Sequence, residues 1–171
     1  MLHETDPVHC DAARIGIRPA ELADLPALLA IEERSFATDR MTPRNFRYAV
    51  EKAKGVVLVA CRQAVTGPGQ AVGYGVVAFH AGTPFARLTS FAVAPGTRGQ
   101  GVGRRLLAAL EKAAAAHGCI GVRLEVRADN AAAIALYGSA GYRRFAIHPD
   151  YYEDGMAALR LQKPLAFHGR P

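Results

Sequence analysis

A glycine-rich, basic turn between an apolar strand and a long helix is the feature that most restricts how this chain can fold. The segment from Arg98 to Arg105 reads RGQGVGRR, and it follows an apolar run that stops at Pro95. A helix start has unpaired N–H groups and a positive dipole end, and glycines let the backbone approach an anion closely. The turn is therefore predicted to hold a phosphate group, with a glycine-rich turn that binds nothing as the alternative.

Two familiar phosphate-binding loops do not fit this segment. A Walker loop requires Lys and then Ser or Thr after its second glycine, but Val102 and Gly103 stand there after Gly96–Gly101. A dinucleotide-binding fingerprint requires a third glycine at its sixth position. The two possible readings place Arg104 or Leu106 at that position, so both loops are excluded.

Hydrophobic periodicity and turn residues along the rest of the chain predict one mixed α/β domain. Strands are predicted over residues 14–18, 56–62, 71–80, 87–93, 120–126, 142–147 and 157–161. Helices are predicted over residues 24–34, 44–52, 101–117 and 129–140, with Asp24, Thr42 and Asn130 or its neighbour Asp129 as caps. The order is β-α-α-β-β-β-α-β-α-β-β. It indicates a single domain over residues 13–166, between a flexible N-terminal tail over 1–12 and a C-terminal tail over 167–171.

Composition narrows the class of protein. Half of the 171 residues are hydrophobic, which is enough for one packed core, and the formal net charge of +6 favours anionic partners. No apolar run approaches the roughly 20 residues of a membrane span, and the N-terminus lacks a signal-peptide stretch, so a cytoplasmic protein without a membrane partner is expected. Cys10, Cys61 and Cys119 form no Cys-x-x-Cys pair, and no His/Cys/Asp cluster has ligand spacing, so no metal is expected.

Glu125 and Tyr137 are the candidate catalytic residues, and for each of them a purely structural role is the alternative interpretation. Glu125 shares its strand face with Arg123 and Arg127, so a solvent-facing ion pair is the simpler interpretation of this segment alone. The other interpretation is a general base, because an N-terminal amine, with a pKa of about 7.7–8.0, must lose a proton before it attacks. Tyr137 is either a core aromatic or a proton donor to a leaving thiolate.

Three stretches together carry a family resemblance. Arg98-x-x-Gly101-x-Gly103 follows SFAVAPGT at 90–97, and it resembles the pyrophosphate loop of the GNAT acetyltransferase superfamily. LEVRADNAAAIALYGSAGYRRF at 124–145 and YYEDGMAALRLQKPL at 151–165 closely resemble RimI-type ribosomal-protein alanine N-acetyltransferases. The resemblance covers residues 15–165.

The resemblance implies a fold, a cofactor and roles for particular residues. The fold would be a GNAT-like twisted mixed sheet of about seven strands, flanked by about four helices and splayed between the fourth and fifth strands, where acetyl-CoA would lie. Glu125 would be the general base and Tyr137 the general acid, and the acetyl group would pass directly to the amine. Tyr151 and Tyr152 would border the peptide groove. The implied acetyl-CoA contacts are Phe91, Ala92, Val93, Arg98, Gly99, Gln100, Gly101, Val102, Gly103, Arg104 and Asn130.

The acceptor implied is the N-terminal amine of a peptide or protein, such as a ribosomal protein. One departure concerns it: RimI-type enzymes carry a Phe-Pro-Trp-like element where this chain reads SFATDRMTP at 35–43, and the chain has no tryptophan. The alternatives are an acetyltransferase of a small-molecule amine and an acetyl-CoA sensor without activity. Direct nucleic-acid binding is the least favoured, because the arginines cluster at the glycine-rich turn. A monomer or weak dimer is expected.

Overall fold

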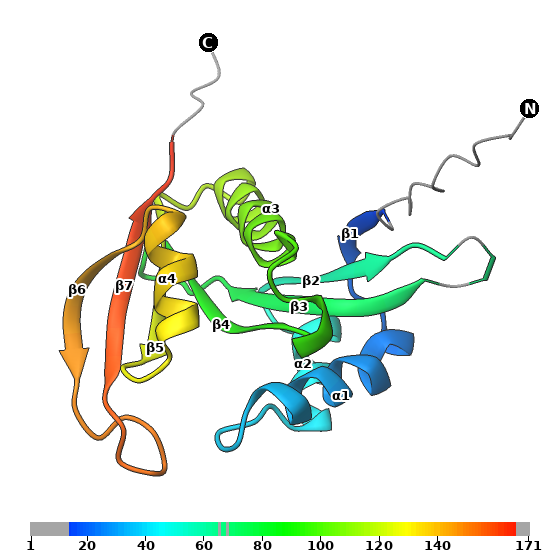
Figure 1. Cartoon of the computed structure of the whole chain (residues 1–171). Helices are drawn as coiled ribbons and strands as arrows, with labels where there is room; N and C mark the ends of the chain where they lie inside the picture. The colour runs from blue at the N-terminus through cyan, green and yellow to red at the C-terminus, as the bar shows by residue number, and fades with distance from the viewer. Residues whose placement is uncertain (1–13, 65, 68, 167–171) are drawn as a thin grey trace, which may run out of the picture.

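The computed structural model describes residues 14–64, 66–67 and 69–166, so Cys10 and both predicted tails lie outside the described residues. A seven-stranded mixed sheet in the order β1-β2-β3-β4-β5-β7-β6 forms its centre (Figure 1). The strands are β1 (Ile15–Pro19), β2 (Gly55–Arg62), β3 (Gln70–Ala78), β4 (Phe85–Val93), β5 (Gly121–Arg127), β6 (Arg143–His148) and β7 (Ala158–Pro164). The helices are α1 (Leu25–Ser35), α2 (Pro43–Glu51), α3 (Val102–Ala116) and α4 (Ala131–Ser139).

This element order is the one that the sequence predicts. Two short 3-10 helices, η1 (Leu22–Asp24) and η2 (Pro95–Thr97), are additions that the sequence analysis did not include. None of the described helices is both long and apolar enough to cross a membrane.

Local capping explains where two of the helices begin. The Thr42 hydroxyl accepts the Asn45 N–H at 3.1 Å, and the Asn45 side chain accepts the Thr42 N–H at 3.0 Å. This reciprocal capping box fixes the start of α2, as predicted. The Asn130 side chain accepts the Ala133 N–H at 3.0 Å and caps α4.

The prediction that the Asp24 side chain caps α1 is wrong. Its carboxylate makes no capping hydrogen bond to α1; it accepts the Glu21 N–H at 2.8 Å and a bidentate pair from Arg18 at 2.7 and 2.8 Å. Because η1 continues directly into α1, that carboxylate faces back to the turn before the helix. The Arg18 guanidinium lowers the pKa of Asp24 below its ordinary value.

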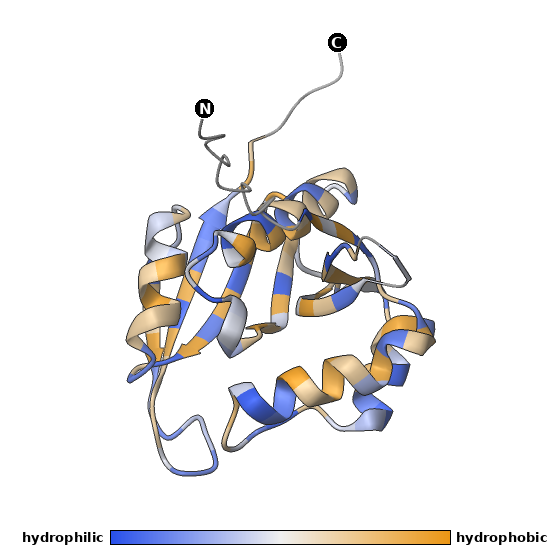
Figure 2. Ribbon diagram, turned by 45° about the vertical axis from the view of Figure 1, so that its right-hand side comes forward, coloured by the Kyte–Doolittle hydropathy of each residue, from blue (hydrophilic) through white to orange (hydrophobic). Residues whose placement is uncertain are grey.

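Helices cover both faces of the sheet. α3 packs on β2, β3 and β5, whereas α1 packs on β3 and β4 and α2 on β2 from the other side (Figure 1). The stripe Leu106, Leu107 and Leu110 is buried under α3, as its spacing predicts. β5 alternates, with Val122, Leu124 and Val126 in the core and polar residues between them, whereas the central strands β2 and β3 are buried on both sides and enter two cores (Figure 2).

β4 and β5 separate part-way along their length. They pair in parallel from Phe85–Gly121 to Leu88–Leu124, while β4 remains paired with β3 up to Val93. The β3 register passes from Leu88 to Ser90 over one step, so Thr89 is an extra residue in β4. Such a bulge bends a strand and increases its twist. The splay between the fourth and fifth strands is thus confirmed, and the Thr89 bulge lies directly after the last β4–β5 pair.

Candidate active site

The splay opens into a cavity of about 680 Å³, a volume in the range of cofactor and ligand sites. Its walls come from the end of β4, the glycine-rich turn, the end of β5, α4 and the segment between α1 and α2. All the predicted cofactor contacts except Gln100 line it, as do Glu125, Tyr137 and Tyr152. Tyr151 is not among the lining residues. Residues from four separate parts of the chain, 32–41, 88–104, 124–137 and the loop residue Tyr152, therefore meet around one space.

The glycine-rich turn places a bare helix start at the cavity. Gly99 and Gly101 have φ of 78° and 76°, a left-handed conformation that glycine adopts without the steric cost of a Cβ. Gly101 is the N-cap of α3 and has no side chain to accept the first N–H groups of the helix. These N–H groups and the positive end of the helix dipole favour an anion at this point.

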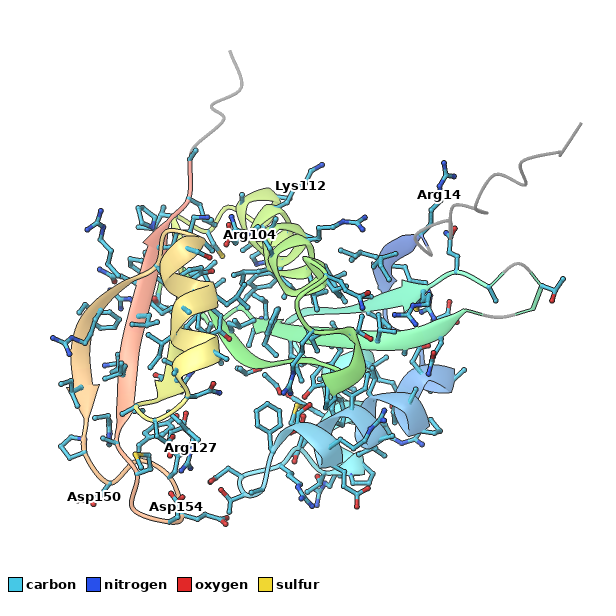
Figure 3. The ribbon with its side chains drawn as sticks, in the orientation of Figure 1. Arg14, Arg104, Lys112, Arg127, Asp150 and Asp154 are labelled. Atoms are coloured by element: carbon cyan, nitrogen blue, oxygen red, sulfur yellow. The ribbon has the colours of Figure 1, made fainter. Side chains whose placement is uncertain are left out.

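Two arginines of the turn are held by neighbouring elements. Arg98 Nε donates to the Val93 carbonyl at 3.1 Å, which ties the turn back to β4. Arg104 reaches from α3 to α4, where its Nη2 donates to Ser139 Oγ at 2.7 Å (Figure 3). Both residues line the cavity, so positive charge surrounds the helix start.

The splay also leaves backbone groups of β4 facing the gap. The Ala94 N–H donates to the Val72 carbonyl of β3 at 2.7 Å. Because successive residues of a strand direct their N–H groups to opposite sides, the Val93 and Phe91 N–H groups point away from β3, toward the place that β5 has left. A hydrogen-bond acceptor in this part of the cavity would face these N–H groups.

Glu125 is held by two arginines from neighbouring strands. Its carboxylate accepts Arg87 Nη2 of β4 at 3.0 Å and pairs with Arg160 Nε of β7 at 3.4 Å; its side chain is 12% exposed. The expected ion pair with an arginine is present, but its partners come from neighbouring strands and not from Arg123 or Arg127 of the same strand. Side chains directly across a ladder are about 5 Å apart, closer than residues i and i+2 of one strand, and Arg160 is the direct partner of Glu125.

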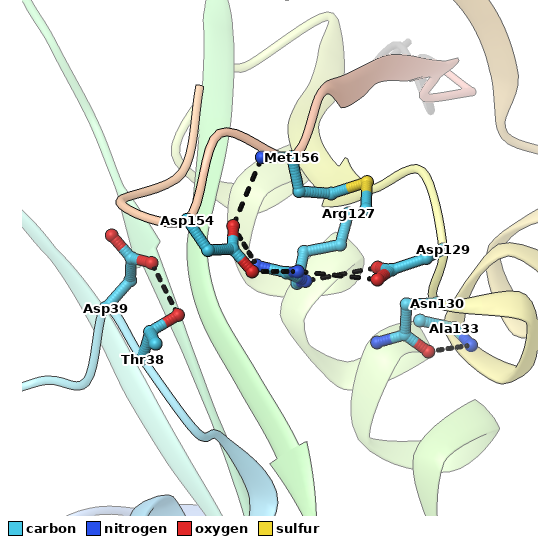
Figure 4. Close-up of polar contacts among 8 residues, drawn as sticks. All are labelled: Thr38, Asp39, Arg127, Asp129, Asn130, Ala133, Asp154 and Met156. Atoms are coloured by element: carbon cyan, nitrogen blue, oxygen red, sulfur yellow. Dashed lines mark hydrogen bonds and ion pairs between the residues drawn. The ribbon is translucent and has the colours of Figure 1, made fainter. Parts of the chain in front are cut away.

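Arg127 has a separate set of partners beside the cavity. Its Nη2 pairs with Asp154 at 2.6 Å and its Nε with Asp129 at 3.1 Å (Figure 4). Its guanidinium also lies 4.9 Å from the Tyr152 ring centroid. Arg127 thereby joins the end of β5 to the loop before β7 and places Tyr152 at the cavity.

Tyr137 lies in an aromatic cluster at the cavity wall. Its ring centroid is 6.2 Å from that of Phe91 and 5.6 Å from that of Tyr142. Burial raises the pKa of Tyr137 above its ordinary value, since the phenolate would be poorly solvated there. The hydroxyl therefore stays protonated over the physiological pH range and is available as a donor.

Glu32 is a cavity residue that the sequence analysis missed. It is 3% exposed, its Oε1 accepts the Met41 N–H at 2.7 Å, and the Tyr74 hydroxyl donates to its Oε2. The same Tyr74 hydroxyl lies 2.7 Å from Ser90 Oγ. A signal was present: Glu32 follows Leu28 by four residues on the apolar stripe of α1, where a carboxylate has no reason to be unless it has partners.

The stability of the protein is expected to depend on pH through Glu32. Burial raises the pKa of Glu32, so the native state releases this proton at higher pH than the unfolded chain. Its contribution is fully present below the unfolded pKa and is lost as pH rises through the folded one. We expect wild type to lose stability relative to Glu32→Gln over that window, by about 1.4 kcal/mol for each pH unit between the two pKa values.

Urea unfolding of both proteins at several pH values measures this difference. Glu33→Gln, on the exposed side of the same helix, controls for the loss of one negative charge. A pH-independent difference between wild type and Glu32→Gln would contradict the expectation.

Comparison with known proteins identifies the family to which this fold and cavity belong. The family model described as "Acetyltransferase (GNAT) family" matches residues 23–142, which include the glycine-rich turn, both splayed strands and α4. The chain belongs to the GNAT acetyltransferase family. Its GNAT fold resembles the crystal structure of the ribosomal-protein-S18-alanine N-acetyltransferase from Escherichia coli, with 31% identity, a TM-score of 0.76 and coverage of 92% of this chain and 97% of that one.

Two curated GNAT relatives match over shorter stretches. The [ribosomal protein bS18]-alanine N-acetyltransferase of Salmonella typhimurium is 45% identical over 67 residues, 39% of this chain and 45% of that protein. The N-alpha-acetyltransferase RimI of Mycobacterium tuberculosis is 48% identical over 60 residues, 35% of this chain and 36% of that protein. The chain thus spans less than half the length of these curated relatives.

Proposed function

We propose that this chain, as a single domain over residues 13–166, transfers an acetyl group from acetyl-CoA to the N-terminal amine of a peptide or protein. The observation that carries the proposal is the cavity that joins the bare start of α3 to Glu125 and Tyr137 across the splayed strands. Relatives named as protein alanine or N-alpha acetyltransferases support this class of acceptor.

The charge around the start of α3 and the close packing at Gly103 support acetyl-CoA as the ligand of this cavity. A Cβ on Gly103 would lie 3.3 Å from Leu136 and 3.5 Å from Val93, so the glycine keeps the first turn of α3 close to α4 and β4. We propose that the N–H groups from Gly99 to Arg104 hold the pyrophosphate, with Arg98 and Arg104 adding charge. Phe91, Ala92 and Val93 would hold the pantetheine and acetyl end, and Asn130 would contact the cofactor. Bound acetyl-CoA supplies the acetyl group as a thioester.

In the proposed reaction, each candidate residue handles one proton. Glu125 takes the proton that the amine loses as the new N–C bond forms. The Val93 N–H polarises the thioester carbonyl, and such a preorganised donor is a large catalytic contribution in general. Tyr137 would donate a hydrogen bond to the sulfur as the C–S bond breaks and then pass it a proton, and a proton from solvent would restore the hydroxyl. Arg87 and Arg160 hold the Glu125 carboxylate in one position until the amine arrives.

Tyr137→Phe is expected to lower kcat by roughly 10²-fold without unfolding the protein, because it removes only the donor hydroxyl. Tyr142→Phe is the matched control: that neighbouring hydroxyl is also buried, has no hydrogen-bond partner among the described residues and does not line the cavity. Steady-state kinetics and thermal unfolding of both variants measure the two effects. Equal kcat values for the two variants would make Tyr137 a core aromatic only.

The experiment that tests the function is acetyl transfer to synthetic peptides with varied N-termini, run beside a panel of free amines and followed by CoA release. Transfer to Ala- or Ser-starting peptides, abolished when their amine is blocked, is the expected result. Turnover on free amines alone would move the enzyme to small-molecule substrates. Acetyl-CoA binding without turnover on any acceptor would indicate that the protein is an acetyl-CoA sensor without activity.

A further inference from the structure

In the part of the chain that the structure describes, no helix covers β5, β7 and β6 on the side that Glu125 faces, which we call the open side. α1 and α2 cover that side over β2, β3 and β4, and the helices α3 and α4 lie on the opposite side (Figure 1). On β5, the core takes Val122, Leu124 and Val126. Arg123 and Glu125 therefore point to the open side, together with their neighbours on β7 and β6.

The residues that share this open side are mostly basic and aromatic. Arg160 and Gln162 are the direct β7 partners of Glu125 and Arg123, and Arg143 of β6 is the direct partner of Gln162. Directly paired residues point to the same side of a sheet. We call this surface the arginine face; its members are Phe85, Arg87, Arg123, Arg143, Phe145, Arg160 and Gln162.

Aromatic rings hold the guanidinium groups of the arginine face in place. The Arg123 Cζ lies 3.8 Å from the Phe85 ring centroid and 5.1 Å from that of Phe145, and the Arg160 Cζ lies 5.0 Å from the latter. Arg123 Nε also donates to Gln162 Oε1 at 3.1 Å. An arginine that is already ordered loses less conformational entropy when it binds, and its planar fork suits a carboxylate.

The arginine face is continuous with the catalytic site. Arg87 and Arg160, which contact Glu125 at 3.0 and 3.4 Å, belong to it, and Phe145 links Arg160 to Arg123. An acceptor whose terminal amine reaches Glu125 has the rest of its chain next to this surface. Two of the four arginines of this face pair with Glu125, whereas Arg123 and Arg143 take part in none of the ion pairs among the described residues, so positive charge is in excess here.

We propose that the arginine face binds an acidic segment of the acceptor polypeptide, downstream of the amine that is acetylated. This proposal rests on the proposed function. Excess positive charge on ordered guanidinium groups favours carboxylates as partners. Nucleic acid is the less suitable partner, because single strands bind to free ring faces, whereas guanidinium groups already cover Phe85 and Phe145.

Paired peptides test this directly. Each pair shares its first four residues, and the following segment carries either Asp and Glu or the uncharged Asn and Gln. At low salt we expect kcat/KM to be roughly 3–10-fold higher for the acidic peptide, because two or three exposed charge pairs would form between its carboxylates and the arginines. This preference should shrink with added salt, which screens exposed charges. Arg123→Gln and Arg143→Gln should each reduce the ratio between the two peptides.

Arg144→Gln is the matched control, since Arg144 pairs with the core residue Leu161 and lies on the other side of β6. It should leave the ratio unchanged. Arg143 is exposed, so its replacement tests the surface even if Arg123→Gln unfolds. Equal kcat/KM for both peptides in wild type would overturn this proposal while leaving the proposed function intact.

Binding without catalysis separates the two proposals. Fluorescence anisotropy of an acidic peptide with a blocked amine is expected to show binding that Arg143→Gln weakens and Arg144→Gln does not, even if no peptide is acetylated. No binding at low salt would overturn the proposal. A labelled single-stranded oligonucleotide that binds more tightly than the peptide, and loses affinity in Arg143→Gln, would overturn it in favour of nucleic acid.

Discussion

Glu125→Gln is expected to lower kcat by roughly 10²–10⁴-fold and to leave acetyl-CoA affinity within about twofold of wild type. An amide cannot accept the proton that the attacking amine must lose, but it keeps nearly the shape of the carboxylate. Glu125 lies on β5, whereas the proposed acetyl-CoA contacts lie mainly on β4 and the glycine-rich turn, so the substitution should leave those contacts in place. Steady-state kinetics on a peptide acceptor gives kcat, and calorimetric titration with acetyl-CoA gives the affinity.

The control must separate proton transfer from the loss of an ion pair, because Glu125 also pairs with Arg87 and Arg160. Glu111→Gln serves this purpose. Glu111 pairs with Lys163 Nζ at 2.7 Å and, like Glu125, has a side chain that is 12% exposed, but it does not line the cavity. Glu111→Gln should retain kcat within about twofold. A wild-type kcat for Glu125→Gln would remove Glu125 as the base.

Gly101→Glu is expected to abolish measurable acetyl-CoA binding, and with it the activity. The new side chain would start from the N-cap of α3 and place a carboxylate where the N–H groups and the helix dipole favour an anion. It would also force a residue with a Cβ into φ of 76°, at a cost of about 1–2 kcal/mol. Titration calorimetry at high protein concentration measures the binding, and thermal unfolding shows that the variant is folded.

Gly118→Glu reproduces the strain of Gly101→Glu without touching the cavity. Gly118 follows α3 with φ of 93°, and a Cβ there meets no atom within 4 Å, as is also true at Gly101. A similar loss of stability with normal acetyl-CoA affinity is expected. Acetyl-CoA affinity that is unchanged in Gly101→Glu would show that the glycine-rich turn does not hold the pyrophosphate.

Several features of the fold follow from residues close together in sequence. Thr42 and Asn45 cap α2, Asn130 caps α4, and the Leu106–Leu110 stripe buries one side of α3, all as local patterns predict. Asp24 shows where such reasoning fails. Asp24 stands at the expected cap position, but its carboxylate accepts hydrogen bonds from Arg18, six residues earlier. It does not cap α1 because η1 already leads into that helix.

The candidate site also has one part that depends on nearby residues in sequence and another that depends on distant ones. The bare start of α3 at Gly101 is a local property, since glycine spacing and a basic helix start lie within eight residues of the sequence. The surroundings of Glu125 are not local: Arg87 lies 38 residues before it and Arg160 lies 35 residues after it, in strands that the sheet brings alongside. Glu32 likewise meets Tyr74 across 42 residues.

The local sequence pattern thus determined the order of elements, the glycine-rich start of α3 and which residues are the candidates for catalysis. Only the assembled sheet decided that Thr89 bulges and β4 parts from β5, that two arginines pair with the Glu125 carboxylate, and that Glu32 lies at the cavity. The physical reason is the range of the interactions. Capping, helix periodicity and glycine conformations act over a few residues, whereas strand register pairs side chains from segments that the sequence keeps far apart.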